Sequence, residues 1–233
     1  MTARRIARLL GAVVATSWAA LLSAPVPSAS AQPCPDVEVL FARGTAEPPG
    51  VGGIGQAFVD AMRAQVGGKS MDVYPINYPA STDFASGIDF ALTVVAGIRD
   101  AADHIQATAA NCPNTRMVVG GFSQGATVAG FVTSAAVPDG IPAGLVPPPM
   151  PPEVANHVAA VTLFGEPSDN FMRDAGAPPV VIGPLYVPKT ISLCADGDTI
   201  CNGAPPGPPT GAHGSYGMNG MVNQAAEFAA KRL

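Results

Sequence analysis

Charged side chains are scarce in this chain of 233 residues: they make up 12% of the sequence, and the 12 basic residues are outnumbered by 17 acidic ones. A protein that binds nucleic acid through its phosphates needs a basic stripe or patch. No segment of this sequence supplies one. We therefore exclude nucleic acid as a partner.

Long apolar runs are missing as well. The run Leu9–Leu22 has 14 residues, whereas a helix needs about 20 to span a bilayer. Three arginines precede this run and small residues ending in A-S-A follow it, which is the pattern of a cleaved secretory signal peptide. We predict a signal peptide over 1–31 and one mature domain over 32–233, secreted to the extracellular space or the cell envelope. Loss of the three arginines moves the net charge from −5 to about −8.

The pattern of a zinc site is also absent. The four cysteines, Cys34, Cys112, Cys194 and Cys201, include no C-x-x-C pair and have no nearby set of histidines, which structural zinc sites require. An even number of cysteines in a secreted chain favours disulfides. We expect two disulfides, no metal and no organic cofactor.

Glycine and proline are frequent, at 26 and 25 residues, but apolar periodic segments run between them and indicate a packed globule with many turns. Strands alternate with helices, which predicts an α/β fold with a parallel sheet covered on both faces. We see neither an internal repeat nor a second domain. The expected strands are 36–45, 70–79, 116–122, 157–167 and 190–194, and the expected helices are 53–66, 88–110, 124–136 and 220–233.

This topology favours one pairing of the cysteines. Cys34 and Cys112 each precede a strand, and the starts of parallel strands lie at the same edge of a sheet, so these two can meet. Cys194 and Cys201 flank a tight loop of sequence ADGDTI. We expect the first bridge to stabilise the fold and the second to fix its local loop.

A serine stands at the junction of a predicted strand and helix. Gly121-Phe122-Ser123-Gln124-Gly125 matches G-x-S-x-G, in which the serine is the nucleophile and the glycines avoid clashes in a strained turn. The match alone is weak, and its alternative is a structural turn serine, but the strand before it and the helix after it favour the nucleophile.

A serine hydroxyl needs a base, and the sequence holds three histidines. In hydrolases of this type the order along the chain is serine, acid, histidine. His104 precedes the serine, and His157 introduces the next strand, so His213 is the base by elimination. The acid should follow a strand between Ser123 and His213; Glu166, Asp196 and Asp198 all qualify, and the pattern alone does not separate them.

Together, the segments GFSQG, FARGT, CADGDTIC and AHGSYG resemble the cutinase family, and more narrowly the secreted cutinase-like esterases of mycobacteria and related actinobacteria. The resemblance covers nearly the whole mature chain. It implies an α/β-hydrolase fold, a three-layer sandwich around a central, mostly parallel sheet. The family's C-x-x-x-D-x-x-C spacing makes Asp198 the acid, and the same two disulfides are implied.

The family's oxyanion hole maps onto the N–H of Gln124 and onto Thr45, where fungal members usually carry a serine. The implied protein is a secreted monomeric serine esterase that hydrolyses short- to medium-chain fatty acyl esters through Ser123, His213 and Asp198. Its expected partner is a small-molecule or lipid ester, with contact at a lipid interface. Two alternatives remain: an acyltransferase with the same triad, and a non-catalytic secreted surface protein with a relic triad.

A proline-rich segment, 138–152, departs from compact cutinases. The sequence leaves open whether it borders an acyl groove or is an inert loop. Phe84, Phe90, Leu145 and Val146 are candidates to line an acyl site, although packing in the core or in a loop is the simpler interpretation of them.

Overall fold

The computed structural model describes residues 33–142, 144–205 and 207–233. The predicted signal peptide, 1–31, lies outside the described residues. Within these ranges, no helix combines the length and the apolar character needed to cross a membrane.

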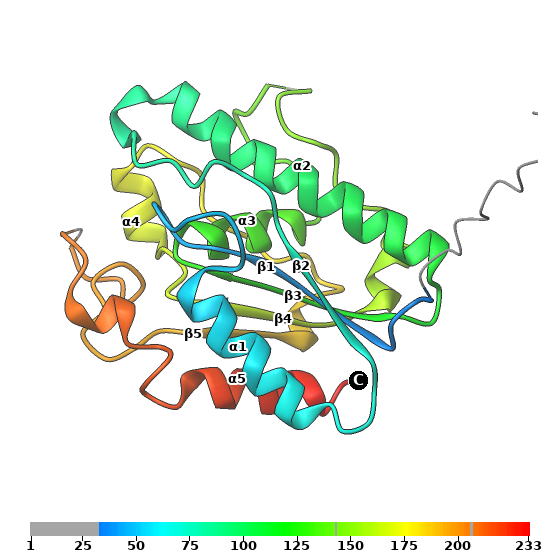
Figure 1. The fold of residues 1–233 in the computed structure, drawn as a ribbon. Helices are drawn as coiled ribbons and strands as arrows, with labels where there is room; N and C mark the ends of the chain where they lie inside the picture. The colour runs from blue at the N-terminus through cyan, green and yellow to red at the C-terminus, as the bar shows by residue number, and fades with distance from the viewer. Residues whose placement is uncertain (1–32, 143, 206) are drawn as a thin grey trace, which may run out of the picture. The chain divides into compact units, whose positions relative to one another are not determined.

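The centre of the domain is a five-stranded sheet in the order β2-β1-β3-β4-β5, and every neighbouring pair is parallel. The central strands β1 and β4 are buried along their whole length, as expected for parallel strands covered on both faces. The predicted parallel sheet is confirmed (Figure 1). The strands are β1 (Val37–Ala42), β2 (Met71–Pro75), β3 (Arg116–Phe122), β4 (Val158–Phe164) and β5 (Thr190–Leu193).

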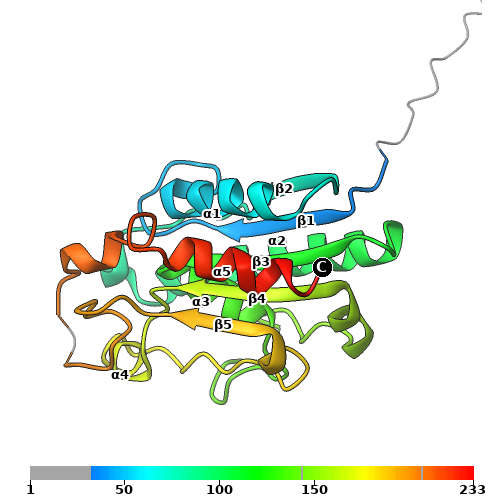
Figure 2. The ribbon, with the colours of Figure 1, turned by 90° about the horizontal axis from the view of Figure 1, so that it is seen from below.

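Helices cover both faces of the sheet and complete three layers (Figures 1 and 2). One face carries α1 and α5, which pack against each other, and the opposite face carries α2 and α3. The α-helices are α1 (Gly52–Gln65), α2 (Ile88–Asn111), α3 (Gln124–Val132), α4 (Asp169–Asp174) and α5 (Met221–Ala230); short 3-10 turns are η1 (Phe84–Ser86), η2 (Pro152–His157), η3 (Val187–Lys189) and η4 (Gly211–Gly214).

Two elements differ from the sequence prediction. The helix expected over 124–136 ends at Val132, because the chain near Gly183 crosses its end: the Gly183 N–H donates to the carbonyl of Thr133. Helix α4 was not predicted, although Ser168 caps it by accepting a hydrogen bond from the Phe171 N–H. A serine at this position is a recognisable helix start, but six residues are too few for a periodic pattern.

Apolar side chains form one core on each face of the sheet. Under α1 and α5, the rings of Phe41, Phe58 and Phe164 contact one another with centroids 5.6–6.2 Å apart. On the other face, Ile98 and Ile105 of α2 pack into the second core. Both cores hold the strands in register and so fix where each strand ends.

The structure contains the disulfides Cys34–Cys112 and Cys194–Cys201. The first closes a span of 78 residues at the edge where β1 and β3 begin, and the second closes a span of seven residues just after β5. Their contributions to stability should differ, because loop-closure entropy grows with the length of the loop.

We expect the double variant C34A/C112A to lose more free energy of unfolding than C194A/C201A. The chain-entropy model gives ~4.5 kcal/mol for the long loop and ~2.5 kcal/mol for the short one. Urea unfolding followed by circular dichroism measures both losses. An equal or reversed order would contradict the entropic account.

Candidate active site

Ser123 lies between the last residue of β3 and the first residue of α3. Its backbone has φ 55° and ψ −120°, an unusual conformation for a residue with a side chain. The flanking glycines make this turn feasible: a Cβ at Gly121 would lie 2.1 Å from the Gly125 carbonyl oxygen, and one at Gly125 would lie 2.0 Å from that of Ala42. The turn therefore presents the Ser123 hydroxyl at the carboxyl edge of the sheet.

His213 is brought to this hydroxyl by η4, although the two residues are 90 positions apart. Its Nε2 lies 2.9 Å from Ser123 Oγ, and its Nδ1 lies 2.9 Å from Asp198 Oδ2. The side chain of His213 is 12% exposed, whereas that of Asp198 is fully buried. In the neutral imidazole, an Nδ1–H donated to the carboxylate leaves Nε2 to accept the serine proton.

Three groups donate hydrogen bonds to the Asp198 carboxylate. Besides His213, the Tyr216 hydroxyl donates to Oδ2 at 2.5 Å and the Ile200 N–H donates to Oδ1 at 3.0 Å. The Tyr216 hydroxyl in turn accepts from the Ala195 N–H at 3.2 Å. Burial, with the hydrogen bond to Asp198, raises the pKa of Tyr216 above its ordinary value. The Asp198 carboxylate thus has hydrogen-bond donors at both oxygens although it is fully buried.

Tyr216 and Gly165 were not identified from the sequence. Gly165 follows β4 with φ 56°, and a Cβ there would lie 3.0 Å from both His213 Cε1 and the Tyr216 hydroxyl. The motif AHGSYG contains Tyr216 three residues after His213, which is the only local signal for it. Gly165 lies near His213 and Tyr216 because the fold brings these distant segments together.

The other candidate acids and histidines lie elsewhere. Asp196 is exposed, and Glu166 accepts a hydrogen bond from the Ser192 hydroxyl at 2.9 Å. His104 pairs with Glu38 at 2.8 Å. Among the described residues, Asp198 is the carboxylate that is hydrogen-bonded to His213.

The loop after β1 carries Thr45 to the same edge of the sheet, where it lines a cavity with Ser123 and Gln124. Glu47 fixes this loop, because its carboxylate accepts from the N–H groups of Gly44 at 2.6 Å and Gly53 at 2.7 Å. Gln124 is the first residue of α3, so its backbone N–H has no acceptor within the helix. Thr45 and Gln124 therefore both line the cavity that Ser123 lines.

This cavity has a volume of about 750 Å³, within the range of ~300–1,000 Å³ for small-molecule sites. Ser123 and His213 line it, and most of the remaining wall is apolar. Phe84, Phe90 and Val146 belong to the wall, whereas Leu145 does not. Three of the four candidates for an acyl site thus lie at the cavity.

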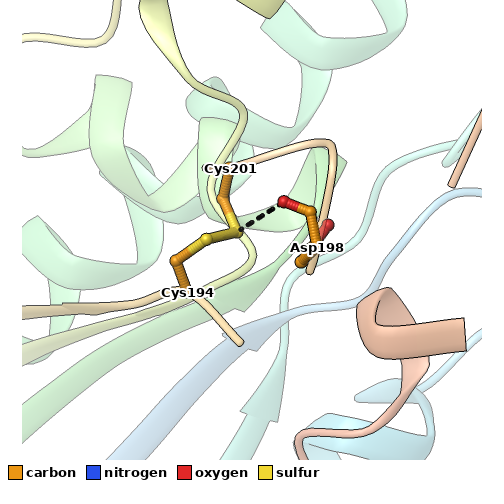
Figure 3. Close-up of side chains that lie close together, drawn as sticks. All are labelled: Cys194, Asp198 and Cys201. Carbon is orange, nitrogen blue, oxygen red and sulfur yellow. Dashed lines mark hydrogen bonds between the residues drawn. A yellow bond between two sulfur atoms is a disulfide. The ribbon is translucent and has the colours of Figure 1, made fainter. Parts of the chain in front are cut away.

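Cys194, Asp198 and Cys201 lie close together, with one ligand-type atom of each within 4.8 Å of the others (Figure 3). This group does not have the chemistry of a thiolate metal site. Both sulfurs belong to one disulfide, and the Asp198 carboxylate accepts from His213, Tyr216 and Ile200. The disulfide instead closes the loop that holds Asp198.

Comparison with known proteins identifies the family. The cutinase family model matches residues 33–233. The chain belongs to the cutinase family. It is 63% identical over 170 residues to the probable carboxylesterase Culp7 of Mycobacterium tuberculosis, which covers 73% of this chain and 89% of that protein. It is 50% identical over 237 residues to the carboxylesterase Culp1 of Mycobacterium bovis, covering 100% and 98%.

Among solved structures, a Trichoderma reesei cutinase in complex with a phosphonate inhibitor is 31% identical, with a TM-score of 0.61, covering 85% of this chain and 77% of that one. The expected α/β-hydrolase fold is thereby confirmed. The family and its carboxylesterase members identify this cutinase-family protein as a carboxylic ester hydrolase, so the non-catalytic alternative is set aside.

Glu166 should make the stability of this cutinase-family protein depend on pH. Burial raises the pKa of Glu166 to about 7, more than the hydrogen bond from Ser192 lowers it. Because the pKa of Glu166 is higher in the folded protein, its contribution to the free energy of unfolding is fully present below the unfolded pKa of 4.5. This contribution is lost as the pH rises through 7. We expect E166Q to raise the Tm relative to the wild type at pH 8 and to change it much less at pH 4.

Glu227 offers a control, because its pKa is shifted in the opposite direction from that of Glu166. It is exposed, and its hydrogen bond and attraction to Lys231 lower its pKa, so E227Q should give no stabilisation at pH 8. Thermal unfolding of both variants at the two pH values measures the contrast. A Tm of E166Q that follows the wild type at both pH values would contradict the assignment.

Proposed function

We propose that this protein is a secreted serine esterase that hydrolyses short- to medium-chain fatty acyl esters through Ser123, His213 and Asp198. The observation that carries the proposal is the continuous chain of 2.9 Å contacts from Ser123 Oγ through His213 to the buried Asp198 carboxylate. Ser123 and His213 line a largely apolar cavity, which supports an apolar acyl group.

The first half of the reaction makes an acyl-enzyme. Ser123 Oγ attacks the ester carbonyl carbon, and its proton passes to His213 Nε2, so a C–O bond forms while the carbonyl oxygen becomes an oxyanion. His213 then protonates the leaving alcohol as the ester bond breaks. In the second half, water attacks the acyl-enzyme, gives its proton to His213, and the acid leaves as Ser123 recovers its proton.

Asp198 orients His213 and stabilises the imidazolium that forms in each half-reaction. The backbone N–H of Gln124, together with Thr45, donates to the oxyanion; a single such donor typically contributes about 2.7–4 kcal/mol. Tyr216 is a positioning residue, because it touches the Asp198 carboxylate and not the substrate.

Two exposed apolar side chains of the cavity wall support contact with a lipid interface. Phe84 and Ile88 line the cavity, yet they are 58% and 59% exposed. Exposed apolar side chains beside a binding site commonly mark an interaction surface. Secretion is supported by the two disulfides. A monomer is sufficient for the chemistry, since one chain supplies the whole site.

Replacement of Ser123 by alanine should abolish turnover. We expect S123A to lose at least about 10⁴-fold in kcat for p-nitrophenyl butyrate, in line with the loss of a triad nucleophile. It should also fail to react with a fluorophosphonate probe that labels the wild type. A folded S123A protein that still turns over the ester or labels would refute the assignment. Product analysis with added alcohol separates hydrolysis from acyl transfer.

Removal of the Tyr216 hydroxyl should slow the reaction without weakening binding. A hydrogen bond to a charged group contributes roughly 1.5–3 kcal/mol, so we expect Y216F to lower kcat about tenfold or more with KM unchanged. Y186F is the matched control. Tyr186 is also buried, but it lies before β5, next to η3, and outside the cavity wall. A parallel loss in both variants would indicate a general structural effect.

A further inference from the structure

The two proposed oxyanion donors lie on parts of the chain that are far apart in sequence. Thr45 belongs to the loop after β1, and Gln124 begins α3. Both parts are hydrogen-bonded to residues 78–81, which follow β2 and are called the bridging segment. An oxyanion hole works only if its donors lie at the right distance from one oxygen. A segment that contacts both parts can set that distance.

The loop after β1 is attached to the bridging segment on both sides of Thr45. The N–H of Ala46 donates to the Ala80 carbonyl at 2.9 Å, and Nη2 of Arg43 donates to the Tyr78 carbonyl at 2.6 Å. The Tyr78 hydroxyl donates in return to the Arg43 carbonyl. Among the described residues, the N–H of Thr45 has no acceptor. The contacts on either side of Thr45 thus fix its backbone and leave that N–H unpaired.

Arg43 and Tyr78 form the buried part of this attachment. The guanidinium carbon of Arg43 lies 5.1 Å from the centre of the Tyr78 ring. Through Nε, Arg43 also donates to the carbonyl of Glu47 at 2.8 Å, so it spans the loop that contains Thr45. In the described part of the chain, neither Arg43 nor Tyr78 belongs to the cavity wall. Both residues can therefore act on the reaction only through the loop.

The junction between the loop and the bridging segment holds two residues in unusual backbone conformations. Ala46 and Ala80 have φ angles of 63° and 50°, a region that residues with a side chain rarely adopt. Such conformations persist only where the surrounding structure enforces them. Loss of the enforcing hydrogen bonds should let this junction relax and shift Thr45 relative to Gln124.

The side chain of Gln124 attaches α3 to the same segment. Its Nε2 donates to the Ser81 carbonyl at 3.1 Å, and the residue is buried. Because a carbonyl oxygen only accepts, this contact determines which end of the amide faces Ser81. Gln124 thus has two separate groups at the site: a backbone N–H at the start of the helix and a side chain that binds the bridging segment.

We propose that the bridging segment sets the spacing of the two oxyanion donors, and that Tyr78 and the side chain of Gln124 are positioning residues for the reaction. The inference rests on the proposed function, because the oxyanion forms only if Ser123 attacks the ester. A displaced donor stabilises the oxyanion less and leaves binding of the uncharged ester unaffected. Loss of positioning should therefore appear in kcat and not in KM.

The test measures kcat and KM of Y78F and Q124M with p-nitrophenyl butyrate. Y78F removes only the hydroxyl that binds the Arg43 carbonyl. Q124M keeps the backbone N–H and removes the side-chain donor to Ser81. We expect each variant to lower kcat about tenfold with KM changed by less than about twofold.

Y74F serves as the control for removal of a tyrosine hydroxyl near the bridging segment. Tyr74 lies in β2, outside the cavity wall, and its hydroxyl contacts Asp100 at 3.1 Å. Y74F should keep the wild-type kcat. An equal loss of kcat in Y74F and Y78F would overturn the positioning role of Tyr78.

A trifluoromethyl ketone gives a readout that a general loss of stability would not move. Ser123 Oγ adds to its carbonyl carbon, the serine proton passes to His213, and the carbonyl oxygen becomes an anion held by the two donors. We expect Ki of this inhibitor to rise in Y78F and Q124M by the same factor by which kcat/KM falls. An unchanged Ki in both variants would contradict the proposal.

The double variant Y78F/Q124M tests whether both side chains act through one segment. Its loss of kcat should be smaller than the product of the two single losses, because residues that share a partner are not independent. Multiplied losses, or wild-type kcat in both single variants, would overturn the bridging role while turnover still depends on Ser123. Circular dichroism checks folding, and Q124M with its Ki decides alone if Y78F is unfolded. Turnover that survives S123A would instead overturn the proposed function, and with it this inference.

Discussion

The close packing of α3 against β1 and β3 is the constraint on which the site depends. Backbone atoms approach so closely at Gly121 and Gly125 that no side chain fits at either position. This approach holds Ser123 at φ 55°, a conformation that costs about 1–3 kcal/mol and persists only where the surroundings enforce it. The buried sheet supplies that enforcement, and the loops after β1, β4 and β5 then converge on one hydroxyl.

The burial of the Asp198 carboxylate sets a second requirement. An ionised carboxylate without partners is very costly to bury, and here the Cys194–Cys201 loop, Tyr216 and the Ile200 N–H surround it. The remaining partner of this carboxylate is His213, whose Nδ1 lies 2.9 Å from Oδ2. The local geometry therefore satisfies the buried carboxylate and directs it to Nδ1 of the imidazole.

Much of this arrangement could be predicted from the sequence, for identifiable reasons. Continuous apolar runs predicted the parallel strands, and the glycines around Ser123 predicted the turn. Both patterns depend on residues that are neighbours in the sequence. Asp198 needed the family spacing, since Asp196 and Glu166 fit the same pattern. Tyr216 and the cavity role of the proline-rich segment could not be predicted, because each depends on contacts between distant segments. The early end of α3 has the same origin, a tertiary hydrogen bond at Thr133.

The Cys34–Cys112 disulfide and the reacting groups lie at opposite edges of the sheet, because one precedes the strands and the others follow them. The Cys34–Cys112 cross-link therefore does not restrain the loops at the carboxyl edge, where the Cys194–Cys201 disulfide closes the loop after β5. Doubling the length of such a loop costs only about 0.6 kcal/mol of closure entropy. The loops after β1 and β4 can therefore acquire insertions and diverge in substrate range, whereas the Cys194–Cys201 disulfide holds the loop after β5.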